Sequence, residues 1–278
     1  MKSQKVWFIT GASKGFGLEI ARSVLANGDK VVGTVRNKPE QLAGKLNNHP
    51  DLQVVVLDVS NEAQVKTGVQ QAIDKFGKID VVVNNAGYGL LSGVEEASDA
   101  EVRKQYDTNV FGLLNVTRAV LPHLRRQHSG HVINISSLFG FGSIAGWGIY
   151  GSTKFAVEGI TEGLALEVGP LGIHVTAVEP GLFRTDFLDE SSFSASKNAI
   201  ADYAATVGPM RSGAGQLHGN QPGDPKKLGE ALIRLVNSEN PPVHLPLGRD
   251  ALAFYRDNAA RLEKELAEWE EVTNSTDY

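Results

Sequence analysis

The fold class of this chain is indicated by the stretch Lys5-Val-Trp-Phe-Ile-Thr10-Gly11-Ala-Ser-Lys14-Gly15-Phe-Gly17. It begins with a short apolar run that predicts a buried strand over residues 5–10, and a helical pattern of apolar residues follows it. Three glycines with the spacing G-x-x-x-G-x-G allow a tight turn and a close approach of the backbone to a ligand. The N–H groups at the start of the next helix would bind a pyrophosphate. The alternative is an ordinary strand-to-helix turn, because the spacing differs from the commoner G-x-G-x-x-G.

Apolar runs and helical patterns alternate along the rest of the chain. Further strands are expected over these ranges: 30–35, 52–57, 79–83, 131–136, 173–178 and 241–247. Helices are expected over these ranges: 39–48, 60–76, 98–127, 150–168, 225–237 and about 250–271. This α/β alternation predicts a parallel sheet with helices on both faces and a ligand beyond the carboxyl ends of its strands. No linker or repeat interrupts it, so a single domain over residues 1–278 is expected.

One segment breaks the alternation. Residues 183–220 are rich in Ser, Gly, Ala and Asn, and only residues 202–207 suggest a helix. A long irregular segment in a compact domain is usually functional, so we interpret about 183–220 as a substrate lid.

Composition excludes several classes of protein. The chain has 278 residues, of which 41% are hydrophobic, a net charge of −5 and no cysteine. The scattered charges argue against nucleic acid or a membrane surface as partner, and the lack of cysteine excludes disulfides and thiolate metal sites. The seven His have no metal-ligand spacing, so no metal site is expected. No signal peptide or membrane span is visible, so we expect a cytoplasmic protein.

Three side chains form a candidate proton-transfer site. Ser137 ends the apolar run His131-Val-Ile-Asn-Ile-Ser-Ser137, and Tyr150 and Lys154 are four residues apart, on one face of a helix. A phenol can protonate an oxygen, a nearby ammonium favours its phenolate form, and a serine hydroxyl can hold the reacting oxygen in place.

Two cations lie where a nucleotide phosphate would bind. Strand 30–35 ends at Val35 and Arg36 instead of the acid that often binds a ribose 2′-hydroxyl, and Lys14 lies in the glycine loop. Two cations and no acid favour the 2′-phosphate of NADP. The alternative is that Arg36 and Lys14 are solvated surface charges.

Short motifs follow one another in a fixed order: Thr10-Gly11-x-x-x-Gly15-x-Gly17, Asn84-Asn85-Ala86-Gly87, Asn109, Ser137, Tyr150-x-x-x-Lys154 and Pro180-Gly181. The ordered set resembles the short-chain dehydrogenase/reductase family, of the compact single-domain type, over roughly residues 5–190. The resemblance implies a Rossmann-type, doubly wound sheet of seven parallel strands with helices on both faces.

The resemblance also implies roles for these residues. Tyr150 would be the general acid in carbonyl reduction and the base in alcohol oxidation, and Ser137 would orient the substrate oxygen. Lys154 would bind the nicotinamide ribose and lower the pKa of Tyr150, and Asn109 would hold a water that links Lys154 to solvent. The family usually has Val or Ile at the position of Phe183, whose bulk is expected to reshape the pocket. The implied NADP(H) site comprises Gly11, Ser13, Lys14, Gly15, Phe16, Gly17, Arg36, Asp58, Val59, Asn85, Ala86, Gly87, Asn109, Tyr150, Lys154, Pro180, Gly181, Phe183 and Thr185.

Apolar side chains near the candidate catalytic residues are expected to line a substrate pocket: Leu138, Phe139, Phe141, Ile144, Trp147 and Phe187, with Phe193 and Tyr203 from the lid. The sequence thus predicts an NADPH-dependent oxidoreductase that interconverts a ketone or aldehyde and an alcohol on a hydrophobic or aromatic substrate. Ordinary core packing of these aromatics and a catalytically silent NADP-binding regulator are the alternatives. The resemblance further implies a homodimer or homotetramer formed through the helices that contain Asn109 and Tyr150.

Overall fold

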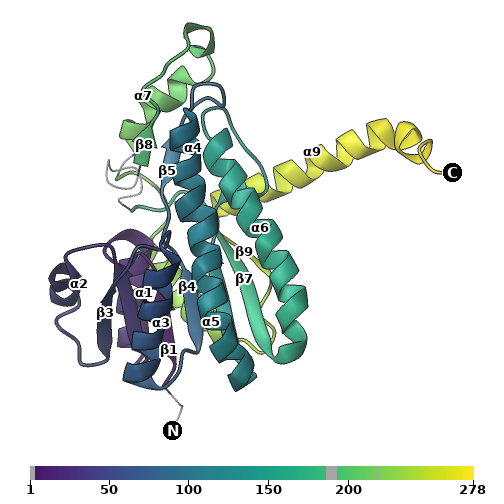
Figure 1. Cartoon of the computed structure of the whole chain (residues 1–278). Helices are drawn as coiled ribbons and strands as arrows, with labels where there is room; N and C mark the ends of the chain where they lie inside the picture. Colours follow the sequence, from purple (N-terminus) through teal and green to yellow (C-terminus); the bar gives the residue numbers. More distant parts are fainter. Residues whose placement is uncertain (1–3, 186–192, 218) are drawn as a thin grey trace.

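One seven-stranded sheet forms the centre of the molecule (Figure 1). The computed structural model describes residues 4–185, 193–217 and 219–278. Every strand pairing in this sheet is parallel, and the strand order is β3-β2-β1-β4-β6-β7-β9. Its strands are β1 (Val6–Ile9), β2 (Lys30–Val35), β3 (Leu52–Val56), β4 (Val81–Asn84), β6 (Gly130–Ile135), β7 (Ile173–Pro180) and β9 (His244–Leu247). The expected Rossmann-type architecture is confirmed.

Side chains of β1 alternate between two hydrophobic cores. Trp7 and Ile9 join the core beneath the helices α1 (Gly15–Ala26), α2 (Pro39–Lys45) and α8 (Pro225–Val236). Val6 and Phe8 join the core beneath α3 (Glu62–Phe76), α5 (Leu113–Gln127) and α6 (Gly148–Val168). All four side chains are almost fully buried, which is typical of a parallel strand that has helices on both faces.

The strand order reverses beside β1. The chain runs from β1 outward to β2 and β3 and then returns to β4 on the other side of β1. In such doubly wound sheets the connections diverge at the reversal and leave a crevice at the carboxyl ends of the two central strands. The glycine loop after β1 and the Asn84–Gly87 turn after β4 both lie at this crevice.

Local signals set the ends of several helices as the sequence predicts. Ser98 and Glu101 form a capping box at the start of α4 (Asp99–Tyr106), and the Asn61 side chain caps α3. Gly77 ends α3 with a φ of 79°, a conformation that favours glycine. Helix α2 ends at Lys45, earlier than expected, because the backbone of Asn47 and Asn48 is left-handed.

The long helix expected over residues 98–127 is interrupted. Between α4 and α5 the chain forms a π-helical segment, η1 (Asp107–Gly112), with an extra residue per turn. Pro122 lies within α5, which continues to Gln127. The interruption places Asn109 at the centre of the π segment.

The segment expected to be irregular contains regular structure. Strand β8 (Phe193–Ala195) pairs with β5 (Gly89–Leu91), and a short turn of helix, η5 (Ala201–Tyr203), precedes α7 (Gly208–Leu217). Neither short strand is visible in the sequence pattern, because each has only three residues. Phe187 and the remaining part of residues 186–192 lie outside the described residues.

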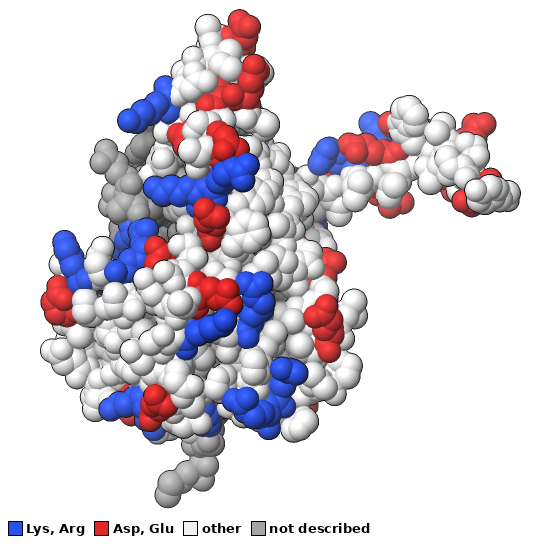
Figure 2. Space-filling view, viewed as in Figure 1, with Lys and Arg blue, Asp and Glu red and all other residues white. Residues whose placement is uncertain are grey.

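The last helix, α9 (Arg249–Asn274), extends away from the body (Figure 1). Figure 2 shows basic and acidic side chains interspersed over the visible face, without a large patch of one sign. Among the residues that the structure describes, no helix is both long enough and apolar enough to cross a membrane.

Candidate active site

A cavity of about 900 Å³ lies along the carboxyl ends of the central strands. Its wall includes residues of the glycine loop, of the strand ends and of the turns around α6, with α9 and the 193–213 region at its outer side. The expected cofactor residues that line it are Gly11, Ser13, Lys14, Gly15, Phe16, Arg36, Asp58, Val59, Asn85, Ala86, Gly87, Tyr150, Lys154, Pro180, Gly181, Phe183 and Thr185. The structure therefore brings together residues that are up to 174 positions apart in the chain.

Three positions of the glycine loop favour glycine. Gly11 and Gly15 have φ values of 66° and 55°, in the left-handed region. A Cβ on Gly17 would lie 2.5 Å from the Gly11 carbonyl oxygen and 2.6 Å from Nδ2 of Asn85. Gly17 is buried behind the loop and does not line the cavity, so it shapes the loop and is not in direct reach of a ligand.

The start of α1 suits an anion. Lys14 at the N-cap is extended, and its side chain makes no capping hydrogen bond within the described chain. The first turn carries no acidic residue, so the positive end of the helix dipole is not neutralised there. The glycine cradle, these N–H groups and the adjacent Lys14 fit the pyrophosphate of a dinucleotide.

The turn after β4 is fastened to the glycine loop. The Thr10 hydroxyl accepts hydrogen bonds from the backbone N–H groups of Asn85 (2.9 Å) and Ala86 (3.0 Å). In return, Nδ2 of Asn85 donates to the carbonyl oxygens of Thr10 (2.9 Å) and Gly11 (3.1 Å). These four hydrogen bonds hold the glycine loop and the turn after β4 together at the point where the strand order reverses.

The ends of β2 and β3 present different charges to the cavity. Val35 is buried and the exposed Arg36 follows it, so β2 ends in a cation where an acid would bind a free 2′-hydroxyl. Asp58, after β3, accepts hydrogen bonds from the backbone N–H (2.9 Å) and hydroxyl (2.7 Å) of Ser60. Its carboxylate is thus held in one orientation at the rim.

Phe183 lies between the cavity and the core. Its ring packs edge-on against Phe16, with 5.3 Å between the ring centres, and it joins the core beneath α1 and α8. A Cβ on Gly223 would lie 2.5 Å from Cγ of Phe183. The absence of a side chain at Gly223 therefore provides the space for the bulk of Phe183.

Ser137, Tyr150 and Lys154 meet at one point of the cavity wall. Ser137 follows the end of β6, and Tyr150 is in the first turn of α6. The hydroxyl groups of Ser137 and Tyr150 are hydrogen-bonded to each other. One turn further along α6, Nζ of Lys154 donates to the Ile135 carbonyl oxygen (2.8 Å) and lies 5.6 Å from the centre of the Tyr150 ring. The geometry expected from the sequence spacing is present.

Burial sets the protonation of this pair. Burial raises the pKa of Tyr150 well above its ordinary value, against the opposing effect of the Ser137 hydrogen bond. Burial also lowers the pKa of Lys154 to about 8, and the nearby Glu158 carboxylate opposes this shift. The expected lowering of the Tyr150 pKa by Lys154 is therefore not found here: burial decides the direction.

Asn109 links two parts of the site from the π segment. Its Oδ1 accepts from the Tyr88 N–H (3.1 Å), and its Nδ2 donates to the Tyr88 carbonyl oxygen (3.0 Å) and to the Thr153 hydroxyl (3.2 Å). It is buried and does not line the cavity. The side chain therefore holds the chain after β4 against the helix that carries Tyr150 and Lys154.

The apolar part of the cavity agrees with most of the expected substrate residues. Leu138, Phe139, Ile144 and Trp147 line it. Phe141 does not: its ring packs against Phe254 and Tyr255 of α9, with ring centres 6.2 and 4.7 Å away. The sequence analysis missed several further lining residues, among them Tyr88, Leu90, Leu182, Pro209, Met210 and Phe254.

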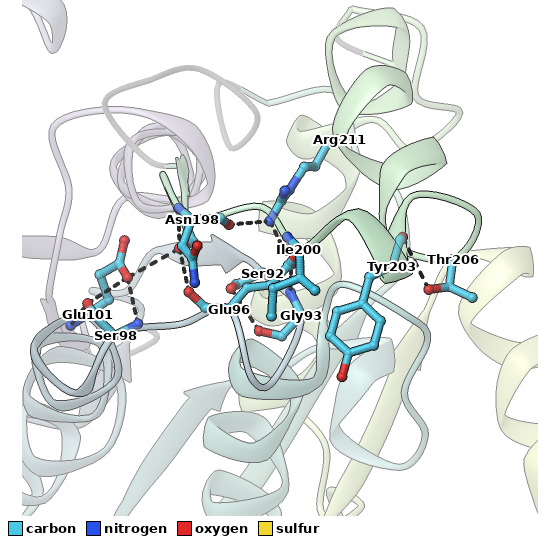
Figure 3. Close-up of polar contacts among 11 residues, drawn as sticks. Ser92, Gly93, Glu96, Ser98, Glu101, Asn198, Ile200, Tyr203, Thr206 and Arg211 are labelled. Atoms are coloured by element: carbon cyan, nitrogen blue, oxygen red, sulfur yellow. Dashed lines mark hydrogen bonds and ion pairs between the residues drawn. The ribbon is translucent and has the colours of Figure 1, made fainter.

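A buried carboxylate fastens the outer wall (Figure 3). Glu96 accepts hydrogen bonds from the N–H groups of Gly93 (2.7 Å) and Ile200 (2.9 Å) and from Nη2 of Arg211 (2.6 Å). The hydrogen bond from Ile200 is the largest of the effects that lower the pKa of Glu96. Tyr203 adds a hydrogen bond to Glu95. These contacts attach the 193–211 region to the chain after β5.

A cluster of titratable groups lies behind Lys154. Nδ1 of His244 is 2.9 Å from Glu179 and 3.3 Å from Glu158, and its Nε2 is 3.3 Å from Glu162. Glu158 and Glu179 are buried, and burial raises the pKa of both carboxyls, that of Glu179 to about 8. Three elements supply this cluster, so no spacing in the sequence could indicate it.

Comparison with known proteins identifies the family. The model of the short chain dehydrogenase family matches residues 5–199. The chain is 38% identical to the oxidoreductase BOA17 of Botryotinia fuckeliana (97% of this chain, 98% of the relative). It is 40% identical to the 3-ketodihydrosphingosine reductase of Bacteroides thetaiotaomicron (88% of each chain).

Solved structures agree with this assignment. A short-chain dehydrogenase from Streptomyces avermitilis superimposes with a TM-score of 0.92 at 40% identity, covering 99% of this chain and 100% of the other. The structure of ElxO with NADP bound superimposes with a TM-score of 0.75 at 28% identity, covering 90% of this chain and 100% of the other. The chain is therefore a member of the short-chain dehydrogenase family, an oxidoreductase whose cavity fits a nicotinamide dinucleotide.

Proposed function

We propose that this protein is an NADPH-dependent oxidoreductase that interconverts a ketone or aldehyde and an alcohol on a hydrophobic substrate. The observation that carries the proposal is the hydrogen-bonded pair of Ser137 and Tyr150 hydroxyls in the cavity wall, one helical turn from the buried Lys154. These groups can bind an oxygen atom and exchange a proton with it.

The cofactor preference rests on charge. Lys14 and Arg36 line the part of the cavity next to the glycine loop, and β2 ends without an acid. Two cations favour a ribose 2′-phosphate, and the NADP bound by ElxO, a structure of the same fold, supports the same choice. When bound, the nicotinamide supplies or accepts the hydride.

The chain's own residues supply positioning and the proton. The raised pKa of Tyr150 keeps its hydroxyl protonated at neutral pH, so it can donate a proton to a carbonyl oxygen in the direction of reduction. The Ser137 hydroxyl holds that oxygen beside Tyr150. Lys154, with a pKa of about 8, is an ammonium at neutral pH and is placed to bind ribose hydroxyls.

The substrate class rests on the apolar wall. Phe139 and Trp147 stack with 5.6 Å between ring centres, and Tyr150 meets both rings edge-on. Met210 and Phe193 pack against the same cluster from the 193–213 region. Such a wall favours a long or aromatic apolar ketone, and the name of the Bacteroides relative, a reductase of a keto lipid base, is consistent with that class.

Two further expectations belong to the proposal. The region 193–213 contributes Phe193, Ser194, Pro209, Met210 and Gly213 to the cavity, in keeping with a substrate lid. Assembly as a homodimer or homotetramer through α5 and α6 is supported by exposed apolar side chains beside and along them: Phe111 (53%), Phe155 (48%) and Leu166 (82%). A cytoplasmic location stays a prediction from the sequence.

Replacing Tyr150 by phenylalanine tests the function. The variant lacks one hydroxyl, so we expect kcat for ketone reduction to fall at least about 100-fold while NADPH binding stays within about threefold. Tyr255→Phe, a tyrosine on α9 that does not line the cavity, is the matched control. Unchanged turnover by Tyr150→Phe would refute the assignment of the acid, and wild-type protein that binds NADPH but turns over no ketone or alcohol in a broad panel would favour the silent regulator.

The same panel tests the cofactor. Wild-type protein should prefer NADPH to NADH by at least about tenfold in kcat/KM, since one phosphate contact with Arg36 is a charge-assisted hydrogen bond. Arg36→Asp should reduce or reverse that preference. Equal efficiency with both cofactors in the wild type would contradict the argument from Lys14 and Arg36.

A further inference from the structure

Among the described residues, none packs against most of the length of helix α9. Phe254 and Tyr255 pack against Phe139 and Phe141, but every residue from 259 to 278 is exposed, and the helix projects away from the body (Figure 1). An isolated helix of this length is only marginally stable in water and usually depends on packing of an apolar face. A partner that covers an apolar face of α9 would therefore stabilise its exposed part.

Five of the six exposed large apolar residues of α9 lie on one seam. Positions along this seam alternate in spacing between three and four residues, as in a coiled coil, with a threonine as the last member: Leu252, Tyr255, Ala259, Leu262, Leu266, Trp269 and Thr273. The outer members are among the most exposed large apolar side chains of the structure, with Leu262 at 56%, Leu266 at 55% and Trp269 at 62%. A seam that holds its register over three heptads is typical of a helix that packs along another helix.

Charges beside the seam specify the partner. A column of four charged residues, each seven positions apart, follows one edge of the seam: Arg249, Arg256, Glu263 and Glu270. Within the part of the chain that the structure describes, none of the four makes an ion pair, whereas Arg261–Glu265 (3.2 Å) and Lys264–Glu268 (3.6 Å) are paired elsewhere on α9. The column is basic at its start and acidic at its end.

We propose that α9 pairs with α9 of a second copy of this chain as an antiparallel coiled coil. In that pairing Arg249 meets the partner's Glu270 and Arg256 meets the partner's Glu263, and two-fold symmetry repeats both contacts. Leu252 stacks on the partner's Trp269 in the same register. All four charges of the column are then matched.

Parallel pairing does not match them. It would place Glu265 beside the partner's Glu270, because opposite edges of the seam meet in a parallel pair, and it would leave both arginines of the column without an acid. The last ten residues of α9 carry four acidic and no basic side chains, so parallel helices also repel each other at their ends. The charge pattern therefore selects the antiparallel arrangement.

The pairing brings the second copy to the active site. Helix α9 is about 39 Å long at 1.5 Å per residue, and its first turns carry Asp250 and Phe254, which line the cavity. An antiparallel partner places its own C-terminal residues beside these turns. The inference rests on α9 alone and stands whether or not the proposed reaction is correct.

Solution mass tests the pairing. Leu262→Glu/Leu266→Glu introduces charge into the seam at exposed positions, and Ala260→Glu/Ala267→Glu makes the same change outside the seam as a control. We expect the wild type and the control to have twice the mass of the seam variant by light scattering, because any assembly through α5 and α6 is common to all three. Equal masses for the wild type and the seam variant would overturn the proposal.

Charge exchange tests the orientation. Arg249→Glu/Arg256→Glu makes the column entirely acidic, and Glu263→Arg/Glu270→Arg makes it entirely basic, so each variant should lose half of its mass when alone. A mixture of the two should regain the doubled mass as a heteromeric complex, and the fourfold exchange should regain it alone. Half-exchanged variants that keep the doubled mass, or that fail to combine when mixed, would rule out the antiparallel contact.

Discussion

Replacing Glu179 by glutamine should flatten the dependence of stability on pH. Glu179 is fully buried at the end of β7 beside His244 and Glu158. Burial, reinforced by the Glu158 charge, raises the pKa of Glu179 to about 8 from a usual value of 4.5. The folded protein therefore keeps a proton that the unfolded chain has lost at neutral pH.

Proton linkage gives the sign and the size of the change in the free energy of unfolding with pH. A raised pKa in the folded state stabilises the protein fully below pH 4.5, and this contribution is lost as the pH rises through about 8. When the folded state binds one more proton than the unfolded state, the free energy of unfolding falls by about 1.4 kcal/mol for each unit by which the pH rises. Because half of this proton has dissociated at pH 8, the loss between pH 6.5 and 8 is about 1.6 kcal/mol.

Two other buried groups set this window. Burial lowers the pKa of His131 to about 3 from its usual value of 6.5. Its effect on stability has the opposite sign to that of Glu179 and acts only below about pH 6.5. Burial lowers the pKa of Lys154 to about 8 from 10.5. The effect of Lys154 on stability is also opposite in sign to that of Glu179, and it acts above about pH 8. Between pH 6.5 and 8 the Glu179 cluster dominates the difference between wild type and variant.

Urea unfolding at several pH values between 6.5 and 8 measures the effect. The wild type should lose about 1.6 kcal/mol more than Glu179→Gln over this window. Glu167→Gln, an exposed carboxylate on α6, is the matched control and should follow the wild type. Parallel slopes for wild type and Glu179→Gln would show that the folded cluster holds no extra proton.

Two more predictions concern the cavity. Gly17→Ala should raise KM for NADPH at least about tenfold, because the added Cβ must displace the Gly11 carbonyl or Asn85 and so distort the loop. The circular dichroism spectrum should change little. An unchanged KM would contradict the role of the close contact. Glu96→Gln should increase amide hydrogen exchange in residues 193–211 relative to Tyr203→Phe, because the glutamine cannot form an ion pair with Arg211. Equal exchange in the two variants would show that Glu96 does not stabilise this region.

The sequence could predict what depends on neighbours along the chain. Strands buried on both faces appear in the sequence as short apolar runs, and the glycine loop follows the first of them. The sequence therefore predicts at which edge of the sheet a ligand binds. Tyr150 and Lys154 could be placed on one helix face from a spacing of four. Each of these features depends on residues that are close together in the chain.

Features that depend on distant residues could not be predicted in the same way. Strands β5 and β8 have three residues each and pair across about 100 positions, so no local pattern indicates the pairing. The sequence predicts Phe141 in the substrate pocket because it lies between the candidate catalytic residues Ser137 and Tyr150 in the chain. The structure instead packs it on α9, more than 100 positions away. The π segment at Asn109 is a tertiary effect too, since hydrogen bonds to Tyr88 and Thr153 hold it.

Helix α6 connects the catalytic residues with the buried acid cluster. Tyr150, Lys154 and Glu158 lie four residues apart on one stripe, which runs from the cavity wall to the cluster that includes Glu179. The Glu158 carboxylate raises the pKa of Lys154 against the effect of burial. With this opposing charge the pKa of Lys154 is about 8, and burial alone would lower it further. Glu158 therefore extends the pH range in which Lys154 stays an ammonium beside Tyr150, and it connects the buried acid cluster with the active site.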